Sequence, residues 1–189
     1  LYVLSVIGIV IGFSNLQLTL VTVHWSTPRQ TGDIPPPVSH STLLRWDQSL
    51  VLYGGFDGKE SSPHVYIMDV VSHKWRKLET LGNRPAARYG HCAVMVADKM
   101  ILLGGNDMTT YFNDMHASNG YVYFSSIIPT KSEKNEWVQI ILKATIPRMA
   151  FHSAIRVGRN MLVYGGQRKG GSMNRETWKV ILSEFSPRD

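Results

Sequence analysis

The chain has a single cysteine, Cys92, among its 189 residues. One cysteine cannot form an intrachain disulfide, and it cannot build a metal site that depends on cysteine pairs. Disulfides are rare where thiols stay reduced, so the sequence favours a cytoplasmic protein; a secreted protein without disulfides is the alternative.

The motifs of common catalytic and metal sites are missing as well. There is no His-Glu-x-x-His motif. Gly170-Gly171 follows Lys169, but a phosphate loop needs a following helix, and no helical pattern comes after this doublet. His91 and Cys92 are neighbours in an expected strand, so their side chains point to opposite faces. We predict no catalytic residue, no metal site and no cofactor.

Residues 1–13 form an apolar run that no charge interrupts. The run is too short for a membrane span of about 20 residues. It has the length of a signal-peptide core but lacks a basic leader and a clear cleavage site. Two interpretations stay open: a buried strand pair or sequence outside the domain, and a signal or anchor that would make the protein secreted or membrane-tethered.

The charge is moderately positive, with a net value of +6 and a pI of about 9.5. A nucleic-acid binder gathers its basic residues on one face or in a run. Here Lys and Arg are scattered along the sequence, and the densest groups are 74–77 and 168–169. We interpret this as a mildly basic surface and predict no nucleic-acid partner.

What the sequence does contain is an internal repeat. A short apolar run ends in a glycine doublet three times, at Gly54-Gly55, Gly104-Gly105 and Gly165-Gly166. Runs of four apolar residues suit a buried strand better than a helix. The doublets are separated by 50 and 61 residues, a period typical of propellers, solenoids or arrays.

Two further markers recur in phase with the doublets. A histidine precedes each one, at His40, His91 and His152, by 14, 13 and 13 residues. Three tryptophans stand 10 residues before a proline: Trp25, Trp75 and Trp137. Equivalent positions in successive units lie apart, so we interpret the histidines as structural groups that bond to backbone, not as metal ligands. We interpret the tryptophans as packing residues between units.

This order of proline, histidine, two apolar strands with Gly-Gly, aromatic strand and tryptophan resembles the kelch repeat over roughly residues 14–183. The resemblance implies an all-β, kelch-type β-propeller built of four-stranded antiparallel blades. About three blades are present, so the propeller is incomplete and the chain fits a fragment of a longer protein.

The repeat markers divide the chain into five parts. After residues 1–13 come the last strands of a preceding blade at 14–34, repeat 1 at 35–84, repeat 2 at 85–146, and repeat 3 at 147–189 without its last strand. In repeat 2 the distance from Gly104 to Trp137 is 33 residues, against 21 from Gly54 to Trp75. We place the third strand of repeat 2 at 120–126 and the surplus in two long loops, 106–119 and 127–135.

The loops after the glycine doublets are the candidate binding sites. The resemblance implies that partners bind loops at one rim of the disc, and loops on a rigid scaffold commonly carry function. The candidate residues are Asp57, Lys59 and Glu60 in the first loop, Asn106, Asp107 and Tyr111 in the second, and Gln167, Arg168 and Lys169 in the third.

We therefore expect a non-catalytic interaction module that binds a protein partner through these loops, as a scaffold or adaptor would. Two alternatives stay open. The chain could be part of an enzyme similar to the galactose-oxidase type, or part of a secreted or membrane-tethered kelch ectodomain. Fold alone does not separate them, because one fold hosts unrelated functions.

Overall fold

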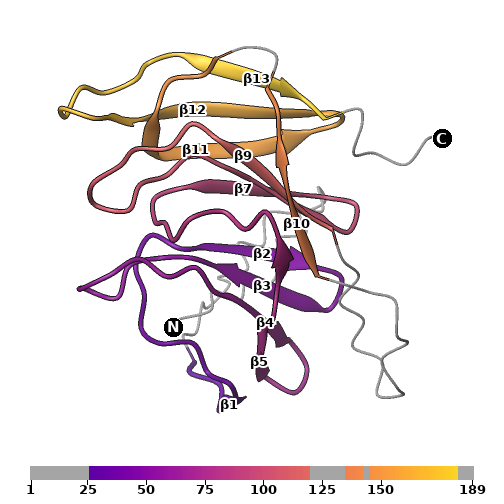
Figure 1. The fold of residues 1–189 in the computed structure, drawn as a ribbon. Helices are drawn as coiled ribbons and strands as arrows, with labels where there is room; N and C mark the ends of the chain where they lie inside the picture. Colours follow the sequence, from indigo (N-terminus) through magenta and orange to yellow (C-terminus); the bar gives the residue numbers. More distant parts are fainter. Residues whose placement is uncertain (1–25, 120–134, 143–144, 183–189) are drawn as a thin grey trace, which may run out of the picture.

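The computed structural model describes residues 26–119, 135–142 and 145–182. Figure 1 shows three β-sheets stacked on one another, and the described residues contain no helix. The all-β, propeller-like architecture expected from the repeats is confirmed. The described sheets stack as neighbouring blades and do not close into a ring.

Blade 1 is a five-stranded sheet in the order β1-β5-β4-β3-β2. Four strands pair antiparallel in chain order: β2 (Thr42–Trp46), β3 (Ser49–Tyr53), β4 (Val65–Asp69) and β5 (Lys74–Leu78). The two-residue strand β1 (Thr31–Gly32) pairs parallel with β5. The link that enters the blade thus covers its outer edge, which protects an exposed strand from pairing with other chains.

Blade 2 repeats this arrangement in the order β6-β10-β9-β8-β7. Its antiparallel strands are β7 (Cys92–Val96), β8 (Lys99–Leu103), β9 (Met115–Asn119) and β10 (Glu136–Ile140). The link strand β6 (Leu81–Gly82) pairs parallel with β10, as β1 does with β5.

Blade 3 has three described strands: β11 (Met149–Val157), β12 (Asn160–Arg168) and β13 (Thr177–Ile181). The sequence predicted that the second strand stops at its glycine doublet. Instead β12 continues through Gly165-Gly166 to Arg168, because Ala150 and Met149 of β11 pair with Gln167 and Arg168. β11 likewise begins two residues before the predicted Phe151.

The core lies between the blades. Val51 and Tyr53 of blade 1 pack against Leu102 and Trp137 of blade 2. Ile101 and Leu103 from the other face of blade 2 pack against Met149, Met161 and Val163 of blade 3. The tyrosine before the doublet is buried in blade 1, with Tyr53 0% exposed, but the equivalent Tyr164 is 59% exposed. The alternation along each strand therefore places one apolar face against each neighbouring blade.

The predicted third strand of repeat 2 was wrong. The strand is Met115–Asn119, within the segment predicted as a loop, and residues 120–126 lie outside the described residues. From the doublet to the third strand the chain therefore has equal length in blades 1 and 2: Gly55 to Val65 and Gly105 to Met115 are each 10 residues. The surplus of repeat 2 lies between β9 and β10, at the opposite end of the sheet.

Candidate functional site

The glycine doublets are the points where neighbouring blades touch. The Gly55 and Gly105 N–H groups donate to the carbonyls of Arg88 and Met149, each in the next blade, at 3.0 and 2.9 Å. A Cβ on Gly54 would lie 2.6 Å from the Arg88 carbonyl oxygen. Gly54 and Gly104 also have left-handed φ values of +66° and +62°. Close backbone approach and positive φ together require glycine at both positions.

The repeat histidine was assigned one position too early in repeat 1. His91 and His152 lie beside the second glycine of their own blade, with Cβ atoms 2.8 and 2.9 Å from where a glycine Cβ would stand. In blade 1 this place belongs to Ser41, not His40. His152 Nε2 meets the Leu103 carbonyl at 3.2 Å, as predicted, whereas His91 Nε2 meets the Thr42 hydroxyl at 2.9 Å, not backbone.

Burial keeps both histidines neutral. It lowers the pKa of His91 to about 3, with further lowering from the charges of Arg88 and His152. Burial also lowers the pKa of His152 to about 4, against a small rise from its bond to the Leu103 carbonyl. In the unfolded chain the same two histidines become protonated below their ordinary pKa of about 6.5.

Stability should therefore fall as the medium becomes acidic. Because the folded-state pKa values are lowered, the contribution of the two neutral histidines to folding stability is full above pH ~6.5 and is lost as the pH falls toward about 4. For His152 alone the loss is on the order of 3 kcal/mol, at ~1.4 kcal/mol for each pKa unit. Urea unfolding between pH 7.5 and 4 checks this, with His152→Gln as the comparison. An equally steep fall in the variant would contradict the assignment.

A ladder of backbone hydrogen bonds joins the blades at their inner ends. The Gly90 N–H donates to the His40 carbonyl at 2.9 Å, and the Phe151 N–H donates to the Gly90 carbonyl at 2.6 Å. All three residues have positive φ, at +55° for His40, +62° for Gly90 and +61° for Phe151. Left-handed backbone is unusual for a bulky residue such as phenylalanine, and strain of this kind is concentrated at functional sites.

Four aromatic rings meet around this ladder. We define the inner cluster as His40, Phe56, Tyr89 and Phe151. The ring centroids of Phe56 and Tyr89 lie 5.1 Å apart, those of Tyr89 and Phe151 5.9 Å, and those of His40 and Phe151 5.1 Å. The rings come from three blades, and Phe151 remains 42% exposed. Sequence reasoning missed this cluster, although two aromatic residues beside the repeat markers, Phe56 after the first doublet and Phe151 before His152, could have pointed to it.

The loops after β3, β8 and β12 project from one side of the stack, at the left in Figure 1. In the first two loops the aspartates accept hydrogen bonds from the backbone of their own loop. Asp57 Oδ1 accepts the N–H groups of Lys59 and Glu60 at 2.8 and 2.9 Å, and Asp107 Oδ1 accepts those of Thr109 and Thr110 at 3.0 and 2.7 Å. Both are Asx turns that shape the loop.

The remaining candidates divide into fixed and free side chains. Asn106 is 2% exposed, and its Oδ1 accepts the Met108 N–H at 3.0 Å. Tyr111 donates to Gln167 Oε1 at 3.4 Å, which links the loops of blades 2 and 3. Arg168 reaches Asn174 and Glu176 at 3.1 and 3.4 Å. The candidates with exposed side chains and no such fixing bond are Lys59, Glu60 and Lys169.

A buried ion pair supports the second loop from beneath. Arg88 is fully buried and contacts both carboxylate oxygens of Asp114, at 2.6 and 2.9 Å. His116 Nε2 meets Asp114 Oδ2 at 3.0 Å, and the Arg88 guanidinium lies 4.2 Å from the Phe112 ring centre. Burial alone would raise the pKa of Asp114, but the bonds from Arg88 and His116 outweigh it and hold that pKa well below its usual range.

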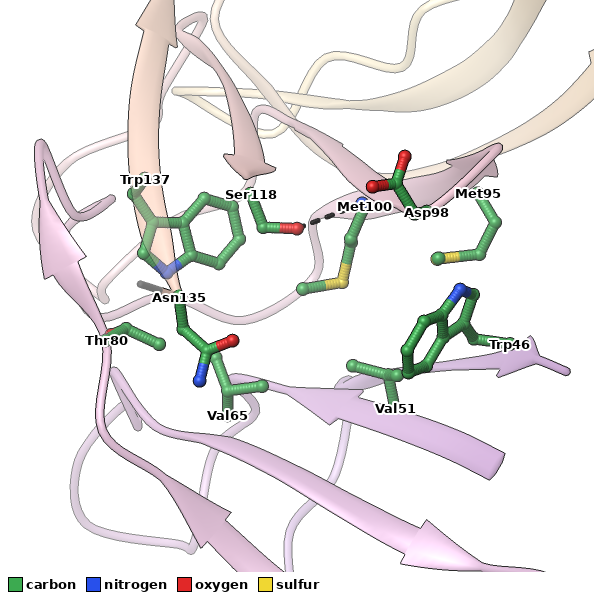
Figure 2. A pocket seen from close by; sticks show the side chains of 10 residues that line it. All are labelled: Trp46, Val51, Val65, Thr80, Met95, Asp98, Met100, Ser118, Asn135 and Trp137. Atoms are coloured by element: carbon green, nitrogen blue, oxygen red, sulfur yellow. Dashed lines mark hydrogen bonds between the residues drawn. The ribbon is translucent and has the colours of Figure 1, made fainter. Parts of the chain in front are cut away.

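A cleft lies between blades 1 and 2 at the opposite end of the stack (Figure 2). Its volume is about 430 Å³, including the part open to solvent. The indoles of Trp46 and Trp137 face it from two sides, and Met100 lies between them. Its Ser118 hydroxyl already accepts the Met100 N–H at 3.0 Å. The wall is mainly apolar and offers no pairing of nucleophile and base.

The described ranges offer little chemistry for catalysis. They contain no group of three or more His, Cys, Asp or Glu residues that could hold a metal ion. Burial raises the pKa of the Cys92 thiol, which keeps it protonated and unreactive. The chain segments that the structure describes include no helix long and apolar enough to cross a bilayer. Residues 1–13 and Trp25 lie outside these segments.

Two blades with four antiparallel strands each and a third with three described strands are stacked, and the first two are each joined to the next at a glycine doublet. This arrangement defines a propeller-type repeat protein. The sequence matches the KLHDC2/KLHL20/DRC7 Kelch-repeats domain over residues 14–178. The chain belongs to the kelch-repeat family.

Three curated relatives indicate how widely this domain is used. Kelch domain-containing protein 3 of Homo sapiens is 32% identical over 68% of this chain and 31% of its own length. Acyl-CoA-binding domain-containing protein 4 of Arabidopsis thaliana is 27% identical over 86% and 24%. A probable serine/threonine-protein kinase of Dictyostelium discoideum is 27% identical over 88% and 16%. The chain thus spans less than a third of the length of these relatives.

Proposed function

We propose that this chain is a non-catalytic protein-interaction module whose binding surface is the loop face. The loop face comprises the loops after β3, β8 and β12 and the inner cluster beside them. The observation that carries the proposal is the inner cluster itself. Phenylalanine and histidine occupy left-handed backbone positions where the middle blade has glycine, and Phe151 stays half exposed. Strain and exposure of large aromatic rings are typical of binding surfaces.

The loops around the cluster support the same role. Asx turns and the Tyr111–Gln167 bond hold the loop backbones, so a partner would lose little entropy in ordering them. Aromatic side chains dominate the energy of protein interfaces. Among the nine loop candidates, we assign the exposed Lys59, Glu60 and Lys169 to partner contact, and the others to shaping or supporting the loops.

We further propose a cytoplasmic location, because Cys92 is a buried free thiol and these 189 residues contain no second cysteine with which it could pair. A fluorescent fusion of the complete gene product tests this, and accumulation in the secretory pathway would contradict it.

The variant Phe151→Gly tests the proposed binding surface. Glycine tolerates the left-handed backbone, so stability should change by less than about 1 kcal/mol as lost ring contacts offset relieved strain. Binding of peptides selected against the chain from a random 12-residue phage library should weaken about tenfold or more, as expected for an aromatic anchor. The matched control is Val71→Gly, an exposed apolar residue in the β4–β5 turn. Equal affinity of Phe151→Gly and the parent chain would overturn the proposal.

A further inference from the structure

The excess positive charge of the chain lies in one contiguous segment, which forms blade 3. Residues 145–182, which include all described strands of blade 3, contain seven Lys or Arg side chains and one Glu, a net charge of +6. This equals the net charge of the whole chain, so the rest of the chain is neutral in sum. Basic residues occur along the whole chain, 7 of 20 of them in this segment, but only here do they lack a matching number of acidic residues.

Part of this charge lies on the loop face. Met149 pairs with Arg168 at the end of the β11–β12 ladder. Arg148 and Lys169 are therefore the first residues beyond the two strands at that end. Arg175 follows Asn174, whose N–H donates to the Gly166 carbonyl at 2.8 Å in the same loop. We call Arg148, Lys169 and Arg175 the basic rim. All three are exposed and form no hydrogen bond or ion pair with another described residue.

The basic rim borders the inner cluster. Arg148 and Phe151 are three residues apart, about 10 Å along extended chain. Tyr111 of the second loop reaches Gln167, the residue directly before Arg168. An extended segment of three or four residues can therefore contact the aromatic rings and the basic rim together.

The loop of blade 1 has the opposite character. Asp57 and Glu60 flank Lys59, and Asp107 occupies the equivalent turn of blade 2. Carboxylates at these loops would repel a phosphate backbone running across the face, whereas nucleic-acid binders cluster basic residues in a patch or stripe on one face. A polypeptide can carry acidic residues at one end and none at the other. The charge pattern of the loop face therefore favours a protein segment whose acidic residues lie at one end.

We propose that the loop face binds an acidic protein segment, with an apolar or aromatic side chain on the inner cluster and carboxylates against Arg148, Lys169 and Arg175. The inference rests on the proposed interaction function and specifies its partner. Exposed charges act mainly on association rate and orientation, so this arrangement would fix the direction in which the segment lies.

The test uses the 189-residue chain and the random 12-residue phage library, followed by fluorescence anisotropy of labelled selected peptides. We expect the selected peptides to be enriched in Asp and Glu. The reversal variant Arg148→Glu/Lys169→Glu/Arg175→Glu should weaken their binding about tenfold or more, since each exposed pair contributes a modest amount. The matched control, Arg29→Glu/Lys74→Glu/Arg84→Glu, changes three exposed blade-1 and link charges equally and should change affinity less than about twofold.

Each outcome decides between the proposals. Peptides without acidic enrichment that still depend on Phe151, and ignore the reversal variant, would overturn the acidic partner and leave the interaction module in place. Selected peptides that respond to neither change would overturn both. A labelled 12-nucleotide thymidine strand that binds more tightly than every selected peptide, and is lost in the reversal variant, would replace the acidic segment with nucleic acid. Circular dichroism and urea unfolding establish that each variant folds.

Discussion

Replacement of Asp114 by alanine should cost the chain about 3–5 kcal/mol of folding stability, the range for breaking a buried ion pair from one side. Arg88 is fully buried, and Asp114 supplies both oxygens that meet its guanidinium. Without that carboxylate the arginine charge stays buried, and the Gly104 and Ala86 carbonyls are the acceptors that still bond to its guanidinium. Urea unfolding at pH 7.5 measures the loss as a shift of the transition midpoint.

The double variant Arg88→Met/Asp114→Ala is the informative comparison. The positions equivalent to Arg88 are Val38 in blade 1 and Met149 in blade 3, both apolar. A methionine there removes the unpaired charge, so the double variant should be more stable than Asp114→Ala alone. Asp98→Ala, whose carboxylate lies 3.8 Å from Lys99, should cost less than about 1 kcal/mol. A double variant as unstable as the single one would show that buried charge is not the cause.

The glycine doublets give the second large effect. Gly104→Ala should destabilise the chain by about 3 kcal/mol, from the left-handed backbone and from overpacking against the next blade. Its new Cβ would stand 2.9 Å from both the Met149 carbonyl oxygen and His152 Cε1. The carbonyl belongs to the backbone that links blades 2 and 3, so it cannot move aside without disturbing their interface.

Gly165→Ala provides the control, because the chain repeats the same local sequence in a different setting. Gly165 has a φ of +76°, yet a Cβ there meets no described atom within 4 Å. Only the backbone strain remains, about 1–2 kcal/mol. The difference between the two variants therefore measures the contact between blades. Equal losses at Gly104 and Gly165 would contradict the role of the doublet as an inter-blade contact.

Much of this fold follows from the sequence because the signals are local. Apolar runs such as Ser49–Tyr53 and Lys99–Leu103 alternate with turns, and each of these two strands ends directly before its glycine doublet. The wrong third strand in repeat 2 has a local cause too. Met115–Asn119 reads Met-His-Ala-Ser-Asn, which has weak strand propensity, and it pairs because β8 and β10 flank it on both sides.

The binding face was less accessible to sequence reasoning. The loops were found because they follow the doublets. Loop position does not reveal that Asp57 and Asp107 accept hydrogen bonds from the backbone of their own loops. His40 was grouped with His91 and His152 by spacing, although the backbone ladder places it with Gly90 and Phe151. The inner cluster joins residues from three blades, and the basic rim joins three separate positions of one blade. Neither is visible before the chain is folded.

The most direct test of the account is to map the binding surface of a selected peptide by amide chemical-shift changes in the isotope-labelled chain. We predict the largest changes at Phe56, Tyr89 and Phe151 and in the loops after β3, β8 and β12. Changes confined to the far end of the stack, at the hairpin turns around Asp47 and Asp98 or at the cleft of Figure 2, would contradict it.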